Sequence, residues 1–111
     1  MNILFRDSRL RKRCNDYRKL QREYGEEMAK VIRRRLDDLY AAPNLQAMRG
    51  LAGRCHELGH DRAGQISLDL RGQYRLLFVS AHGPCPVNAD GGLDWSRVTA
   101  IEVIGVKDTH E

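Results

Sequence analysis

The chain of 111 residues carries 19 Lys and Arg against 15 Asp and Glu, a formal net charge of +4. This length has room for one ordinary domain, and we expect a single domain over residues 1–111. No apolar stretch approaches the roughly 18 residues of a transmembrane helix. The apolar start precedes the charged residues, the reverse of a signal peptide, so we expect a cytoplasmic protein without membrane contact.

The positive charge is concentrated in the first third of the sequence. Residues 1–36 hold twelve basic and five acidic residues, a net charge of +7, whereas residues 37–111 hold seven basic and ten acidic residues, a net charge of −3. Such asymmetry is typical of a surface for a polyanion, and equally of helices coated with Lys and Arg for solubility.

The first part of the chain has the three-to-four spacing of apolar residues that predicts helices. One apolar stripe covers residues 10–24, behind a polar N-cap at residue 7 or 8, and Gly25 ends it. A second stripe covers residues 28–40. We therefore predict a helical hairpin over residues 8–42, with a short edge strand at residues 3–5 before it.

After residue 50 the apolar period changes to two, which predicts strands. Residues 66–70 and 74–79 form a hairpin around a tight turn, with a candidate strand at residues 54–58 before it and another at residues 98–106 after it. Residues 80–94 form a long polar loop with Gly and Pro. The predicted fold class is α+β, with two N-terminal helices packed on one face of a small antiparallel sheet over residues 53–107.

Several short motifs occur in a fixed order. MAKVIRRRL spans residues 28–36, RCHELGHDRAGQ residues 54–65, YRLLF residues 74–78 and DWSRVTAIEV residues 94–103. Together they resemble the HigB-like, or plasmid-maintenance killer, branch of the RelE/ParE toxin superfamily, over essentially the whole chain. The chain departs from that pattern in three places. The closing Asp-Tyr-His reads Asp-Thr-His at residues 108–110, a turn lysine is missing at residues 58–62, and Ile66 replaces an aromatic residue.

The resemblance implies the toxin of a type II toxin–antitoxin system, a metal-independent, ribosome-associated mRNA endoribonuclease that inhibits translation and uses no cofactor. Such cleavage uses the RNA 2′-hydroxyl as nucleophile and needs a base, an acid and cations around the phosphate. The predicted catalytic residues are His56, Arg62, Arg75, Asp108 and His110. The predicted RNA-binding residues are Arg54, His60, Gln65 and Lys107.

Arg75 is the one predicted site residue whose direction follows from the strand pattern. It alternates with Tyr74 and Leu76, so it lies on the opposite face of its strand. If the helices cover the apolar face, Arg75 lies on the open face. There it either contacts RNA or pairs with an acidic neighbour, Asp69 or Glu102.

The partners that the resemblance implies are mRNA, the ribosome and a cognate antitoxin, in a hetero-oligomer. The antitoxin is expected to be a helix-turn-helix protein encoded beside the toxin. Two non-enzymatic alternatives stay open: a ParE-like inhibitor of DNA gyrase, and a degenerate toxin that only binds antitoxin and regulates its operon. A zinc site of Cys55, His56 and His60, joined by Cys85 or His110, lacks the spacing of known zinc motifs, so we expect no metal.

Overall fold

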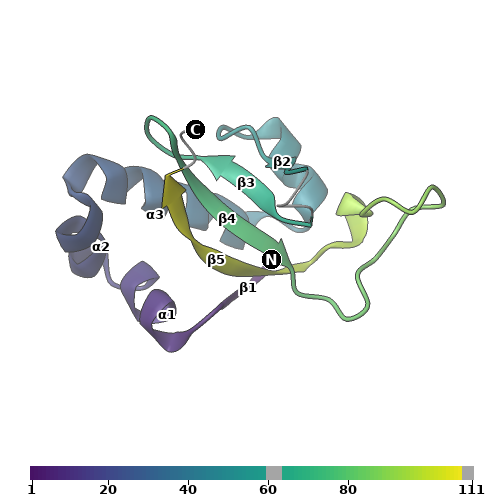
Figure 1. Cartoon of the computed structure of the whole chain (residues 1–111), viewed down its shortest axis with the longest axis horizontal. Coiled ribbons are helices and arrows are strands. Elements are labelled where there is room, and N and C mark those ends of the chain that lie inside the picture. The colour runs from purple at the N-terminus through teal and green to yellow at the C-terminus, as the bar shows by residue number, and fades with distance from the viewer. Residues whose placement is uncertain (60–63, 109–111) are drawn as a thin grey trace.

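The computed structural model describes residues 1–59 and 64–108, and within them a five-stranded sheet packs with three α-helices, one behind the sheet and two beside it (Figure 1). The strands lie in the order β1-β5-β4-β3-β2. β1 runs parallel to β5, and the other neighbours are antiparallel. The strands are β1 (Asn2–Phe5), β2 (His56–Glu57), β3 (Ile66–Asp69), β4 (Tyr74–Ser80) and β5 (Ala100–Asp108).

The helices precede most of the sheet in the chain, as the sequence predicts, but the first predicted helix is two helices. They are α1 (Ser8–Cys14) and α2 (Tyr17–Tyr24), followed by α3 (Glu26–Ala41). The break has a local cause: the Asp16 side chain accepts hydrogen bonds from the backbone N–H groups of Arg18 and Lys19, at 3.0 and 3.3 Å, and so caps a new helix. The apolar spacing continues across this break, so the sequence pattern does not show that the helix is divided.

One face of the sheet packs against the helices and forms the core. α3 contributes a buried stripe, and the sheet contributes the residues of β3, β4 and β5 that point toward it. The stripe is Ala29, Ile32, Leu36 and Leu39, and its partners include Ile66, Leu68, Leu76, Phe78 and Val103. This arrangement confirms the predicted α+β class. It leaves the other face of the sheet turned toward the viewer in Figure 1, with α3 behind.

β5 contains a one-residue bulge. Leu77 pairs with Gly105, but Phe78 pairs with Val103, so Ile104 is an extra residue with no counterpart on β4. Because side chains alternate along a strand, the extra residue reverses which face each later side chain occupies. Beyond the bulge, Lys107 points to the open face.

The connection between β4 and β5 leaves the body of the molecule as a long arm (Figure 1). It contains an isolated bridge between Val87 and Leu93 and ends in a short 3₁₀ helix, Trp95–Arg97. Its base is fixed by His82, whose Nε2 accepts a hydrogen bond from the backbone N–H of Thr99 at 2.9 Å. A 3₁₀ helix at Leu45–Gly50 joins α3 to the strands. Among the described residues, no helix has the length and apolar character to cross a membrane.

Candidate active site on the open face of the sheet

A row of charged side chains crosses the open face of the sheet. Asp69 on β3 pairs with Arg75 on β4, and Arg75 pairs with Lys107 on β5. Arg54, just before β2, reaches Asp69 from the other side. We call Arg54, Asp69, Arg75 and Lys107 the charge row. Three cations and one carboxylate give it a net charge of +2.

Asp69 is the anchor of this row. Its Oδ1 forms an ion pair with Arg75 Nε at 2.9 Å, and its Oδ2 accepts a hydrogen bond from Arg54 Nε at 3.0 Å. The hydrogen bonds from Arg54 to Asp69, with the charge of that carboxylate, raise the pKa of the Arg54 guanidinium. One carboxylate therefore orients two guanidinium groups toward the same side of the sheet. Arg75 thus makes the ion pair with Asp69 that the sequence predicts as the alternative to RNA contact, and Glu102, the other acidic neighbour, lies opposite Val79.

Arg75 is held in place more firmly than an ordinary surface arginine. Its Nη1 also donates to the carbonyl oxygens of Gly72 and Tyr74, at 3.1 and 3.0 Å. Only a fifth of its side chain is exposed, against two thirds of that of Arg54. A cation fixed in this way can hold an anion without first losing rotamer freedom.

His56 lies on the same face, one row away from the charged residues. It pairs with Ser67, two positions from Asp69. Its Nδ1 lies 2.7 Å from the carbonyl oxygen of Arg54, and because a carbonyl only accepts, Nδ1 carries the proton. This leaves Nε2 to take up or give a proton. Arg54 presents its carbonyl from a left-handed backbone conformation, with φ +49°.

Two residues on the same face of the sheet as the charge row are buried. Leu77 and Ser67 are buried there, although the helices lie on the other side of the sheet. The Oγ of Ser67 and the Oε1 of Gln65 are both buried without a hydrogen-bond partner in the described part of the chain. Of the predicted RNA-binding residues, Gln65 is thus half-buried, whereas Lys107 is exposed.

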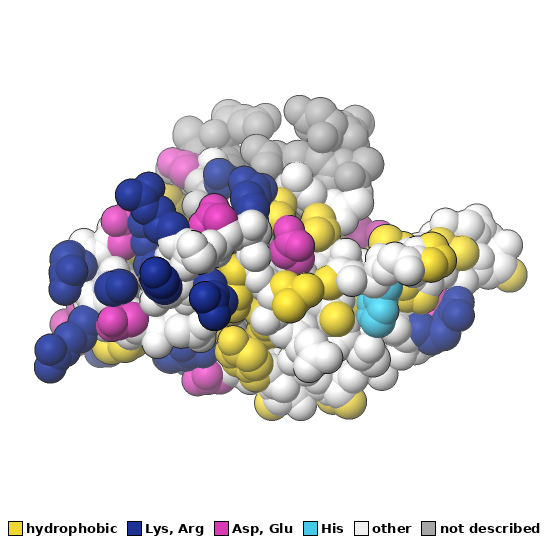
Figure 2. Space-filling view, turned by 90° about the horizontal axis from the view of Figure 1, so that it is seen from below, with side chains coloured by type: hydrophobic (Ala, Val, Ile, Leu, Met, Phe, Trp, Pro, Cys, Tyr) yellow, Lys and Arg dark blue, Asp and Glu magenta, His cyan; other side chains and the backbone are white. Residues whose placement is uncertain are grey.

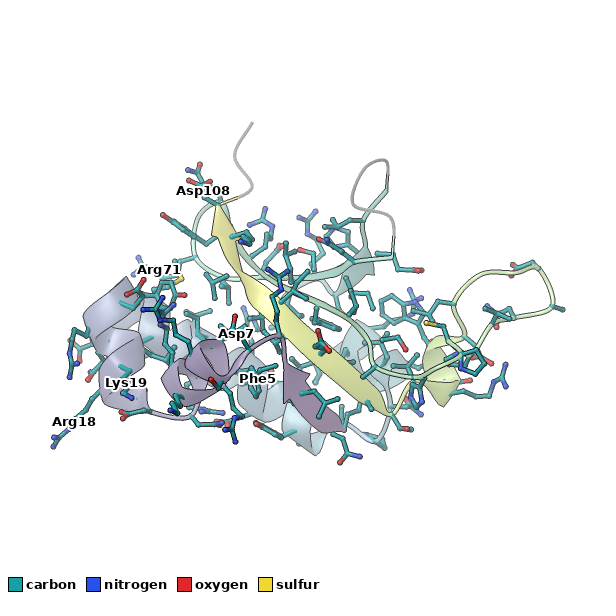
Figure 3. All side chains as sticks on the ribbon, turned by 60° about the horizontal axis from the view of Figure 1, so that its bottom comes forward. Phe5, Asp7, Arg18, Lys19, Arg71 and Asp108 are labelled. Atoms are coloured by element: carbon teal, nitrogen blue, oxygen red, sulfur yellow. The ribbon has the colours of Figure 1, made fainter. Side chains whose placement is uncertain are left out.

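Asp108 lies on the other face from the charge row. It pairs with Tyr74 at the end of β5, and its Oδ2 accepts a hydrogen bond from Gln73 Nε2 at 3.1 Å. Figure 3 places it at the tip of the strand. The bulge is the cause, since an unbroken strand would turn Asp108 toward the open face and Lys107 away from it. His60, Arg62 and His110 of the predicted site also lie outside the described residues.

The structure thus brings together Arg54, Arg75 and Lys107, with His56 nearby, and separates Asp108 from them. Asp69 is the residue that sequence reasoning missed as a member of the site, because it entered only as a possible ion-pair partner. The strand pattern contained a signal for it: Asp69 is the last residue of β3 and Arg75 is the second residue of β4, in register across the turn.

The cysteines and acidic groups give no metal centre in residues 1–59 and 64–108, where no three His, Cys, Asp or Glu side chains gather. Cys55 is next to His56 in the chain but is buried on the core side. Burial raises the pKa of its thiol to about 12, so it stays protonated and is a poor metal ligand.

The chain is similar to known proteins in its fold. No family model matches the chain, and no curated protein matches its sequence. Among solved structures, it is similar to a YoeB/ParE toxin from Agrobacterium tumefaciens, with 19% identity and a TM-score of 0.57 over 99% of this chain and 100% of that one. It is also similar to the YoeB–YefM complex (17% identity, TM-score 0.56) and the YoeB dimer (18%, 0.55) from Staphylococcus aureus, each over 99% of this chain and 98% of the other. At these identities the likeness establishes a fold, and that fold is the one found in YoeB/ParE toxins.

Proposed function

We propose that this protein is the toxin of a toxin–antitoxin system and cleaves mRNA on the ribosome without a metal ion. The ordered motifs support the HigB-like branch of the RelE/ParE toxins, and the fold shared with YoeB/ParE toxins supports the same superfamily. The single observation that carries the enzymatic part is the charge row, because it sets oriented cations beside a histidine on an open sheet face.

The proposed chemistry is attack of the RNA 2′-hydroxyl on the neighbouring phosphate. Arg75 and Arg54 hold the phosphate oxygens and stabilise the charge that builds up on them in the transition state. Lys107 extends the row of cations toward the next phosphate of the RNA. The 2′-oxygen bonds to phosphorus as the bond between phosphorus and the 5′-oxygen breaks, which leaves a 2′,3′-cyclic phosphate. His56 Nε2 takes the proton of the 2′-hydroxyl, and the leaving 5′-oxygen takes a proton from water. Catalytic roles for Arg62 and His110, and RNA contacts by His60 and Gln65, stay part of the proposal. Asp108 lies on the other face of the sheet, so it has no assigned role at the charge row.

A cognate antitoxin is the proposed partner. One structural neighbour is a YoeB–YefM complex, which supports an assembly of this kind for the present chain. We propose a helix-turn-helix antitoxin encoded beside it, a hetero-oligomer of the two, and a cytoplasmic location where ribosomes are available.

The test is cleavage in a translating extract. Purified protein is added, and primer extension on the mRNA maps new 5′ ends. We expect new ends with the wild type, and a loss of at least about 100-fold in their rate with Arg75→Ala, as for removal of a transition-state contact. Arg34→Ala is the matched control, because Arg34 is an exposed arginine on α3, away from the sheet face.

Three outcomes are informative. New 5′ ends that require Arg75 support the proposal, and equal activity of Arg75→Ala removes the assigned site. An absence of new ends, together with blocked supercoiling by DNA gyrase, replaces the nuclease with the ParE-like alternative.

A further inference from the structure

The helical end of the molecule contains a hollow lined almost wholly by cations. It lies between α1 and α2, has a volume of about 410 Å³, and its one carboxylate is Glu23. Its cations are Arg9, Lys12, Arg13, Lys19 and Arg22. Figure 2 shows the Lys and Arg side chains gathered at this end of the molecule, and Figure 3 shows Lys19 on α2. We call this the α1–α2 hollow.

The cations of the hollow are largely unpaired. Glu23 lies 3.8 Å from Arg13, and within the described residues no other carboxylate comes within ion-pair distance of the lining cations. On α3 the pattern is the opposite: Lys30 pairs with two glutamates one turn before it, and Arg33 pairs with Asp37. A helix coated for solubility interleaves the two signs, as α3 does. The hollow therefore holds positive charge that the protein itself does not neutralise.

A second, smaller hollow connects this region to the sheet. It has a volume of about 220 Å³ and lies where α1 and α2 meet the bulge of β5. Arg9 and Arg13 line both hollows, Arg6 adds another cation, and Lys107 closes the far side. The rest of its wall is one carboxylate, Asp7, with the apolar or aromatic side chains of Leu10, Tyr24, Ile104 and Val106 and the backbone of Gly105. Since Lys107 also belongs to the charge row, cations follow one another from the α1–α2 hollow to the candidate active site. We call this path the basic track.

We propose that the basic track binds the phosphate backbone of RNA, at a stretch beyond the point of cleavage. The assignment rests on the proposed ribonuclease function, since that function brings RNA to the charge row. Three of the five cations in the hollow are arginines, whose planar fork matches phosphate oxygens. Neutralising several phosphates in a row releases counterions, which gives strong binding without any base contact.

An acidic protein segment fits the same charges less well. Protein interfaces are centred on aromatic or aliphatic anchors and are poor in lysine. The hollow is lined by long cationic side chains with Ser8 and Glu23, and it has no aromatic or aliphatic residue in its wall. The exposed large apolar side chains of the described residues, among them Leu4, Tyr40 and Val87, lie elsewhere.

The experiment measures binding of the full-length protein to a fluorescent RNA hairpin carrying 2′-O-methyl groups, which this chemistry cannot cleave. The test variant is Lys12→Ala/Arg22→Ala, and the matched control is Lys30→Ala/Arg34→Ala, which removes the same charge from α3. We expect the test variant to lose about tenfold in affinity at low salt. The slope of log K against log salt should fall by about 1.4–1.8, or 0.7–0.9 for each lost phosphate contact, with the control near wild type.

A poly-glutamate peptide with the same charge as the hairpin is the competitor, and we expect it to displace RNA poorly. Equal losses in the test and control variants would show that only net charge matters and would overturn the track. Equal competition by the peptide would assign the hollow to an acidic protein instead. Cleavage is not measured here, so RNA binding through the hollow survives a failure of the nuclease proposal. Unchanged binding in the test variant would overturn the track alone.

Discussion

The charge row on the sheet and the α1–α2 hollow use the same residue types in opposite ways. In the row, Arg54 and Arg75 are fixed by the carboxylate of Asp69, at 3.0 and 2.9 Å. In the hollow, only Arg13 has a carboxylate within ion-pair distance among the described residues, at 3.8 Å. Cations held in one orientation can stabilise negative charge at a single point. Unpaired, mobile cations instead give a positive electrostatic potential over a wide surface. The difference suggests a site for chemistry and a separate surface for holding the substrate.

The largest effect is expected when Asp69, which orients both arginines of the charge row, loses its charge. Asp69→Asn keeps the shape of the side chain but loses the charge that orients both arginines, so we expect cleavage to fall at least about 100-fold. Stability should fall by about 1–2 kcal/mol in urea unfolding, because the pairs are only partly exposed.

The matched control for that change is Asp37→Asn. Asp37 also accepts a hydrogen bond from an arginine, Arg33, and forms an ion pair with it, but most of the Asp37 side chain is exposed. We expect a loss below about 0.5 kcal/mol and unchanged cleavage. Similar effects of the two substitutions would mean that the row is only a surface ion pair.

The sequence alone predicted which face of the sheet carries Arg75 and which part of the chain carries the basic surface. Strand alternation placed Arg75 on the face away from the helices, and the +7 charge of the first 36 residues located the basic surface. Gly25 ends a helix as predicted, with φ +85°. These features depend on local patterns, in which each residue's neighbours along the chain determine its environment.

The features that sequence missed depend on contacts between distant segments. The bulge at Ile104 is invisible in a run of β-branched residues, because only its pairing with β4 shows the extra residue. That bulge exchanges the faces of Lys107 and Asp108, which the motif alone could not indicate. The parallel pairing of β1 with β5 likewise joins the two ends of the described chain.

Two buried thiols, one in the helical region and one beside the sheet, make the stability of each region depend on pH. Burial raises the pKa of Cys14, at the end of α1, from 9.0 to about 11, and that of Cys55, beside β2, from 9.0 to about 12. Above pH 9 the unfolded chain releases thiol protons that the folded chain keeps, so stability is full below pH 9 and falls as the pH rises toward 11 or 12. Each thiol should contribute about 1 kcal/mol of loss per pH unit in this window.

Urea unfolding at a series of pH values above 9 measures this loss. Cys14→Ala and Cys55→Ala should each make the decline with pH shallower, while Cys85→Ala, at an exposed position, should leave its slope unchanged. If the slope does not change in Cys14→Ala, then α1 opens to solvent without global unfolding. The helical region would then be less stable than the sheet.

The smallest expected effect falls on Lys107, where the two regions meet. Gly105 has φ +154°, and a Cβ placed there would lie 3.4 Å from Lys107 Cε, so Gly105→Ala strains the backbone and puts a methyl group in contact with the lysine side chain. We expect about 1 kcal/mol less stability and a few-fold weaker binding of the 2′-O-methyl hairpin. Gly91→Ala is the control, because Gly91 also has a positive φ, +90°, but its added Cβ would meet nothing within 4 Å. That variant should lose stability and keep its RNA affinity. Equal RNA affinity in both variants would place Lys107 outside the track, and the row and the hollow would then be two separate surfaces.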